Sequence, residues 1–241
     1  MSAIILKLVA MITMLVDHIG HIFFNDNNWM RCIGRISFPL YAFMIAEGYA
    51  QCKENNRLKT YWLRIFILAL ASEIPYDNAF YKGFPYLSNQ NVIFTLWLAL
   101  SALILASKAK PMPLKPLPIA FAAWLAEYLH SDYGYVGVLL VSAYALYIRF
   151  AKDKPGYIRL CCLSLIGISF AGFYIVGNIP SLAAIIYFFR FRNWLQLGVL
   201  GAIPFIYLYN GEKGFSHPSM QYFYRVFYPV HLAFLAIFLH I

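Results

Sequence analysis

The sequence IILKLVAMITMLVDHIGHIFF, residues 4–24, decides the fold class of this chain. It is long enough to cross a hydrocarbon core about 30 Å thick as one helix, for which about 20 apolar residues suffice. Near its end, Asp17 stands next to His18. Ionisable side chains at membrane depth cost about 3 kcal/mol each, so they usually face a protein interior or a wet cavity. The pair is therefore the first candidate for function.

The rest of the chain repeats this apolar character. Of the 241 residues, 62% are apolar and 12% are charged, and the mean hydropathy is +0.64. This balance predicts a polytopic membrane protein rather than a soluble domain. We predict an all-α transmembrane bundle of about ten spans, at residues 4–24, 32–51, 60–80, 90–107, 113–129, 133–150, 157–176, 179–190, 193–209 and 221–240.

The connections between these spans are short, so we expect one integral membrane domain over residues 1–241. The first apolar run carries Asp17 and His18 where a cleavable signal peptide has small residues. We therefore expect the first helix to remain in the protein.

The net charge of +9 is distributed as in a membrane protein rather than as in a nucleic-acid-binding protein. Basic residues gather at alternate connections, at Lys53, Arg57, Lys59 and Arg64, at Lys108, Lys110 and Lys115, at Arg149, Lys152, Lys154 and Arg159, and at Arg190 and Arg192. The positive-inside rule assigns these loops to the cytoplasm, and with them both termini. We expect a lipid bilayer and no nucleic acid as a partner.

Four cysteines, Cys32, Cys52, Cys161 and Cys162, show neither metal-ligand spacing nor a disulfide framework. We interpret them as small packing residues and expect no metal.

Most polar residues of the predicted spans share one depth, toward the outer surface. They are Asp17, His18, Arg35, Glu73, Asp77, Asn91, His130, Asp132, Asn210, Arg225 and His231. Separate interfacial anchors would favour Trp, Tyr and Lys at both surfaces, so this pattern indicates a shared polar cavity open to the outside. Glu47 is the exception, since it lies toward the cytoplasmic end of its helix.

His18 suits the role of general base, because a neutral imidazole removes protons near neutral pH. A packing histidine that bonds a backbone carbonyl is the alternative. Neighbours in a helix point about 100° apart, so Asp17 more naturally faces His21, four residues on. A pair between Asp17 and Arg35 is also open.

Arg35 shares a helix face with Arg31 and precedes Pro39, which can kink the helix and free a carbonyl. Its planar donors suit a phosphate, a carboxylate or a developing oxyanion. A plain charge pair with Asp17, Glu73 or Asp77 is the alternative.

Glu73 and Asp77 are four residues apart, so two like charges share one helix face unless a cation or a shared proton intervenes. This favours a general-base or cation-binding role. The alternative is a helix that ends at Pro75 and leaves Asp77 solvated. Asp132 and Asn210 also fit ordinary cap and turn roles, whereas no turn chemistry accounts for His231.

Several motifs together resemble the TraX family, the F-pilin acetylases, nearly from end to end. They are Leu6-Lys7, Asp17-His18-Ile19-Gly20, Gly34-Arg35-Ile36-Ser37-Phe38-Pro39-Leu40, Glu47-Gly48-Tyr49, Glu73-Ile74-Pro75-Tyr76-Asp77, Phe94-Thr95-Leu96, Asp132-Tyr133-Gly134, Tyr209-Asn210-Gly211 and Phe227-Tyr228-Pro229-Val230-His231. Their order and spacing make the resemblance more specific than one Asp-His pair.

The resemblance implies a membrane acetyltransferase of the bacterial cytoplasmic membrane that transfers acetyl from acetyl-CoA to the N-terminal amine of a pilin subunit. On this hypothesis His18, Asp17 and Arg35 are catalytic. The acceptor pocket is assigned to Glu73, Asp77, Asn91, Asp132, Tyr133, Asn210 and His231, and the CoA site to Glu47, Arg57 and Arg64.

Two alternatives stay open. A proton-coupled transporter also uses intramembrane Asp, Glu, Arg and His, although no inverted repeat is apparent. The same machinery also suits a sugar, a lipid or a small amine as the acetyl acceptor.

Overall fold

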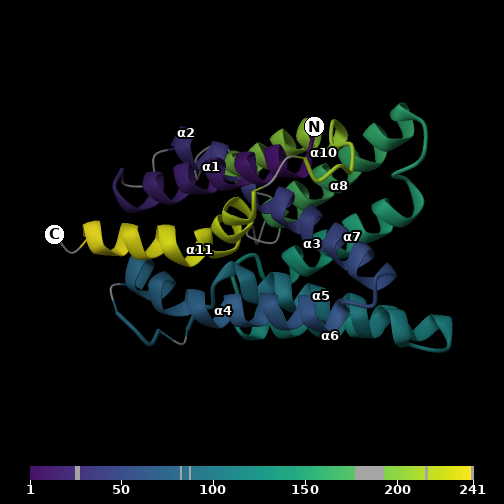
Figure 1. The fold of residues 1–241 in the computed structure, drawn as a ribbon, viewed down its shortest axis with the longest axis horizontal. Coiled ribbons are helices and arrows are strands. Elements are labelled where there is room, and N and C mark those ends of the chain that lie inside the picture. The colour runs from purple at the N-terminus through teal and green to yellow at the C-terminus, as the bar shows by residue number, and fades with distance from the viewer. Residues whose placement is uncertain (25–27, 82, 87, 177–192, 215–216, 240–241) are drawn as a thin grey trace. The chain divides into compact units, whose positions relative to one another are not determined.

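A computed structural model describes residues 1–24, 28–81, 83–86, 88–176, 193–214 and 217–239 of the chain. These residues form helices and connecting turns, with one isolated bridge between Gln90 and Ser131 (Figure 1). The helices are α1 (Ala3–Ile22), α2 (Asn28–Gly34), α3 (Ser37–Glu54), α4 (Leu58–Tyr81), α5 (Val92–Lys108), α6 (Pro116–Tyr128), α7 (Gly134–Phe150), α8 (Gly156–Val176), α10 (Ala202–Tyr207) and α11 (Pro218–Leu239), with 3₁₀ helices η1 (Met112–Leu114) and η2 (Asn193–Gly201). The all-α prediction is confirmed for this part of the chain.

Three of the described helices are long and apolar enough to cross a membrane: Ala3–Ile22, Gly156–Phe173 and Ser219–Leu239. Shorter apolar helices occur at Val92–Lys108, Gly134–Phe150 and Leu195–Tyr207. These helices support a helical membrane protein. The span predicted at 179–190 lies outside the described residues.

The predicted helix at 32–51 is two helices, α2 and α3, separated at Arg35 and Ile36. Pro39 explains the break. It has no N–H to donate to the carbonyl four residues earlier, which belongs to Arg35, and its ring would clash with that carbonyl. Pro39 therefore lies in the first turn of α3, where a missing donor costs little.

The alternative in which Pro75 ends its helix is wrong, because α4 continues through Pro75 to Tyr81. Asp77 is consequently part of the helix and is only 1% exposed, rather than solvated beyond a helix end.

The chain divides into two compact units, each built from two segments. Unit 1 comprises Met1–Tyr41 and Phe150–Tyr224. In it, α1 packs on α2, and α2 and α8 both contact η2. Phe38 stacks on Phe170 with ring centroids 5.9 Å apart, which places the start of α3 against α8.

Unit 2 comprises Ala42–Arg149 and Arg225–Ile241. Its α5 packs against both α4 and α6, and the three helices run side by side (Figure 1). Phe43 meets the ring of Tyr144 edge-on at 5.7 Å and is 2% exposed, so α3 and α7 share a buried aromatic contact.

Phe43→Ala should lower the free energy of unfolding by about 3 kcal/mol, because truncation of a buried phenylalanine leaves a cavity. Phe121→Ala is the matched control, since Phe121 is 59% exposed. Thermal unfolding of the detergent-solubilised protein measures both. Equal midpoints for the two variants would contradict the Phe43 contact.

Candidate functional site

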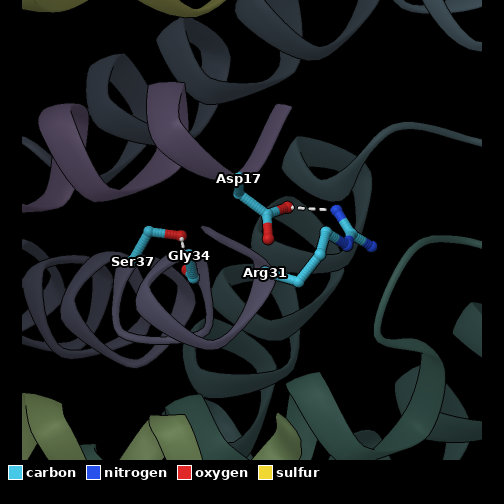
Figure 2. A network of polar contacts seen from close by, with 4 residues as sticks. All are labelled: Asp17, Arg31, Gly34 and Ser37. Carbon is cyan, nitrogen blue, oxygen red and sulfur yellow. Dashed lines mark hydrogen bonds and ion pairs between the residues drawn. The ribbon is translucent and has the colours of Figure 1, made fainter. Parts of the chain in front are cut away.

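The C-terminal end of α1 is held by an ion pair to α2 in unit 1. Arg31 Nη1 lies 2.6 Å from Asp17 Oδ2, and the two side chains are 16% and 12% exposed (Figure 2). A charge-assisted bond of this length is among the stronger polar contacts, and removal of one partner from a buried pair typically costs about 3 to 5 kcal/mol. The pair therefore fixes the position of α2 against α1.

Two glycines allow α1 and α2 to approach closely enough for this pair. A Cβ at Gly34 would overlap the Asp17 side chain, and a Cβ at Gly20 would lie 2.6 Å from Met30 Cβ. Ser37 Oγ donates to the Gly34 carbonyl at 2.8 Å, beside the ion pair in Figure 2. The Asp-His-Ile-Gly and Gly-Arg motifs thus contribute their glycines to one packing contact.

The sequence placed Arg31 on a helix face with Arg35 but did not identify Arg31 as the partner of Asp17. Asp17 and Arg31 are 14 residues apart and lie on different helices. Helical periodicity relates residues of one helix only, so it does not predict this contact. His18 and Arg35 both lie in unit 1 and are half-buried, and Arg35 lies in the break between α2 and α3.

A second polar cluster lies in unit 2, where Asn91 joins α4 to α5. Asn91 is fully buried and caps α5, because its Oδ1 accepts from Ile93 N at 3.0 Å. Its Nδ2 donates to the Ala69 carbonyl at 2.9 Å and to Glu73 Oε2. Glu73 and Asn91, both predicted to bind substrate, are thus in direct contact.

Asp77 lies one helical turn beyond Glu73 on α4. Its Oδ2 accepts from the backbone N–H of Tyr86 at 2.8 Å. Asp132, another predicted site residue, lies close enough to act electrostatically on both Tyr76 and Tyr81. Asp77, Asp132 and the phenols of Tyr76 and Tyr81 therefore lie near the C-terminal end of α4.

Thr95 links α5 to the turn before α7. Its Oγ1 is 2.9 Å from Ser131 Oγ and also donates to the Asp132 carbonyl. The backbone of Gln90 bonds that same turn, donating to His130 at 3.2 Å and accepting from Asp132 at 3.0 Å. Sequence reasoning did not include Thr95 in the site. Its spacing of four residues from Asn91 places both on one helix face, and this spacing could have indicated that Thr95 belongs to the same cluster.

The remaining predicted acceptor residues lie in different places. His231 in α11 is buried in unit 2, with Nδ1 2.8 Å from the Phe227 carbonyl. Tyr133, with a φ of +65°, belongs to the turn before α7. Asn210 is in unit 1 and exposed, and its side chain bonds Glu212 twice, at 2.8 and 3.2 Å. The turn interpretation fits Asn210, and Gly211 there has a φ of +80°.

The residues predicted for CoA binding all belong to unit 2. Arg57 and Arg64 are exposed, and both act electrostatically on Cys52 near the end of α3. Glu47 is 7% exposed, and Tyr61 lies within electrostatic range of it. One cation therefore lies in the connection between α3 and α4 and the other in the first two turns of α4, both within electrostatic range of Cys52.

An apolar groove of about 700 Å³ lies between α4 and α11 in unit 2. It is lined by Ala71, Ile74, Pro75, Asn78, Pro229, Val230, Ala233, Ala236 and Ile237. Asn78, the one amide among these residues, bonds the Ile74 carbonyl at 2.8 Å. The groove therefore suits apolar atoms and offers no catalytic group.

Within the described ranges, no group of three His, Cys, Asp or Glu side chains is placed to hold a metal ion. The four cysteines are free thiols.

Long apolar helices that enclose ordered charged residues define this chain as a helical membrane protein. The TraX protein family model matches residues 2–239, so the chain belongs to the TraX family. It is 30% identical to a "Probable fimbrial assembly protein FimC, serogroup H1" of Dichelobacter nodosus, over 97% of this chain and 94% of that relative. It is 26% identical to "Protein TraX" of Escherichia coli (strain K12), over 66% of this chain and 61% of that protein. No solved structure matches the chain.

Gly34→Ala should destabilise the protein by about 1 to 3 kcal/mol, because the added methyl overlaps the Asp17 side chain. Gly172→Ala is the control: a Cβ there meets no atom within 4 Å, so alanine should be neutral or slightly stabilising. Thermal unfolding in detergent compares the two. The packing of α1 on α2 is disproved if Gly34→Ala behaves like Gly172→Ala.

Asn91→Ala should cost about 1 kcal/mol for the lost cap and about 1 to 3 kcal/mol more for the acceptors it leaves without a donor. Asn55→Ala serves for comparison, because Asn55 is exposed and its side chain donates to the Gln51 carbonyl at 2.8 Å. Unfolding midpoints report both changes. A similar small loss in both variants would argue against the Asn91 network.

Proposed function

We propose that this protein is a membrane-embedded acetyltransferase that moves an acetyl group from cytoplasmic acetyl-CoA to the N-terminal amine of a pilin subunit. Membership of the TraX family supports the proposal. So does the 30% identity to a relative that is named a probable fimbrial assembly protein. The proposed biological role is therefore modification of a subunit that is assembled into a pilus or fimbria.

The observation that carries the proposal is the ordered charge at the end of α1. Asp17 is held by Arg31, and the adjacent His18 is half-buried. A fixed helix end with an imidazole beside a compensated carboxylate is a suitable setting for a general base, because the base must be positioned before its proton is taken. On this proposal the Asp17–Arg31 pair acts on His18 indirectly, by fixing the helix end from which His18 projects.

In the proposed reaction the amine nitrogen attacks the thioester carbonyl carbon, and His18 takes the proton that the nitrogen loses. Arg35 stabilises the oxyanion of the tetrahedral intermediate. The C–S bond then breaks, an amide forms, and the CoA thiolate leaves with a proton. An acetyl-histidine intermediate on His18 is a variant of the same scheme.

The donor site is proposed at Glu47, Arg57 and Arg64, with acetyl-CoA entering from the cytoplasm. Exposed guanidinium groups suit the CoA phosphates, because arginine donates in a planar fork that matches phosphate oxygens. The acceptor pocket is proposed around Glu73, Asp77, Asn91, Asp132, Tyr133 and His231 of unit 2. Asn210, which the sequence also assigned to substrate binding, belongs to unit 1, where its side chain bonds Glu212.

These assignments go with a topology of about ten spans, both termini in the cytoplasm, in one domain of the bacterial cytoplasmic membrane. Alternating basic loops support that orientation.

Purified protein in detergent should release thiol from acetyl-CoA only when a peptide with a free N-terminus is present. His18→Ala should lower kcat at least 100-fold, since a general base typically contributes about 10²- to 10⁴-fold. Arg35→Ala should lower kcat with little change in KM for acetyl-CoA, because it acts on the transition state. His217→Ala, at an exposed histidine, is the control.

Other outcomes separate the competing hypotheses. Thiol release with sugars or lipids but not with peptides would keep the acetyltransferase and change the acceptor. Absence of thiol release and of acetyl-CoA binding in folded protein would favour the proton-coupled transporter. Full activity of folded His18→Ala and Arg35→Ala would remove their catalytic assignment.

A further inference from the structure

In the pocket proposed for the acetyl acceptor, two carboxylate oxygens are buried and receive no hydrogen bond. They are Glu73 Oε1 and Asp77 Oδ1. Each residue uses its other oxygen. Glu73 Oε2 accepts from Asn91, and Asp77 Oδ2 accepts from Tyr86 N. Both carboxylates are therefore fixed in place, with one acceptor each left over.

Because these oxygens are buried, leaving them ionised and without a partner costs free energy. Asp77 is 1% exposed, and an ionised carboxylate away from water needs a compensating charge or donor. The two residues are one turn apart on α4, so their negative charges face the same side. No ion pair to either carboxylate occurs within the described part of the chain. The two oxygens are thus buried acceptors to which no described side chain donates a hydrogen bond.

The chemistry of the cluster favours a primary ammonium ion over a metal ion. The described residues provide no third carboxylate, histidine or cysteine in a metal-binding arrangement. An ammonium group carries one positive charge and three N–H donors, so it satisfies two separate carboxylate oxygens at once. A neutral hydroxyl has one donor and no charge, so it satisfies one of the two oxygens and compensates neither negative charge.

We propose that Glu73 and Asp77 form a binding site for the primary ammonium group of the acceptor, which makes the enzyme selective for amines over hydroxyls. The inference rests on the proposed function only in naming the bound amine as the acetyl acceptor. The amine binds as its conjugate acid and gives one proton to one of the two carboxylates, and its neutral nitrogen then attacks the thioester. Asn91 is the positioning residue that fixes Glu73.

Calorimetric titration of the detergent-solubilised protein tests this site without acetyl-CoA. The probe is a short lysine-free peptide amide with a free N-terminus, and the comparison is the same peptide with an acetylated N-terminus. Wild-type protein should bind the free amine at least tenfold more tightly, which corresponds to about 1.4 kcal/mol. Equal affinity for the two peptides would overturn the proposal, and this comparison requires no variant.

Glu73→Gln and Asp77→Asn should each reduce affinity for the free amine at least tenfold and leave the acetylated peptide unaffected. Glu54→Gln is the matched control, because Glu54 is exposed at the end of α3. Undiminished amine binding in both folded variants would assign the amine to another site.

Two further titrations distinguish which cation the site binds: an N-terminal ammonium, any primary ammonium, or sodium. An N-acetylated peptide with one lysine that binds as tightly as the free N-terminus would assign the site to primary amines in general. In a competition titration, sodium chloride is added at the same concentration as the amine peptide, and choline chloride is the control. Displacement of the peptide by sodium chloride but not by choline chloride would overturn the ammonium assignment in favour of sodium. Amine binding without any acetyl transfer would reject the proposed function and retain the site.

Discussion

The hydrocarbon interior of a membrane offers no hydrogen-bond partner, and this constraint governs the whole structure. Backbone groups must be paired within the chain, so the described residues form helices joined by short turns. Polar side chains obey the same rule. Asn91 uses its amide to cap α5 and to reach α4, and Thr95 bonds the turn before α7. Asn91 and Thr95 therefore also fix α5 against the segments around it.

The Asp17–Arg31 pair shows how the need to pair a buried charge fixes the position of one helix against another. An ion pair of 2.6 Å requires close backbones, and Gly34 permits that approach because any side chain would overlap Asp17. Small residues at helix contacts are the usual means of packing in membranes, where lipid tails remove the hydrophobic drive between helices. The family motif around Gly34 is thus a packing requirement as much as a chemical one.

The residues proposed to carry the function are divided between the two units. Unit 1 contains His18 and Arg35, whereas unit 2 contains Glu73, Asp77 and Asn91. On the proposed function, the general base and the carboxylates that recognise the acceptor amine therefore belong to different units. Glu73 and Asp77 of unit 2, like Asp17 of unit 1, are carboxylates that need a positive charge close by. In unit 1 the compensating cation is Arg31, and in unit 2 the proposed cation comes with the substrate.

The sequence by itself determined the helical membrane class, because long apolar runs leave no other way to pair the backbone, and its motifs indicated the family. It also predicted most helix ends to within a few residues, as for Val92–Lys108 against 90–107. The tertiary structure alone decided which polar groups meet. Arg31 reaches Asp17 across a turn, and Asn91 reaches Glu73 from the next helix. Periodicity orders residues along one helix, but a contact between helices depends on how their surfaces pack, and the break at Arg35 set by Pro39 redirects the chain at that point.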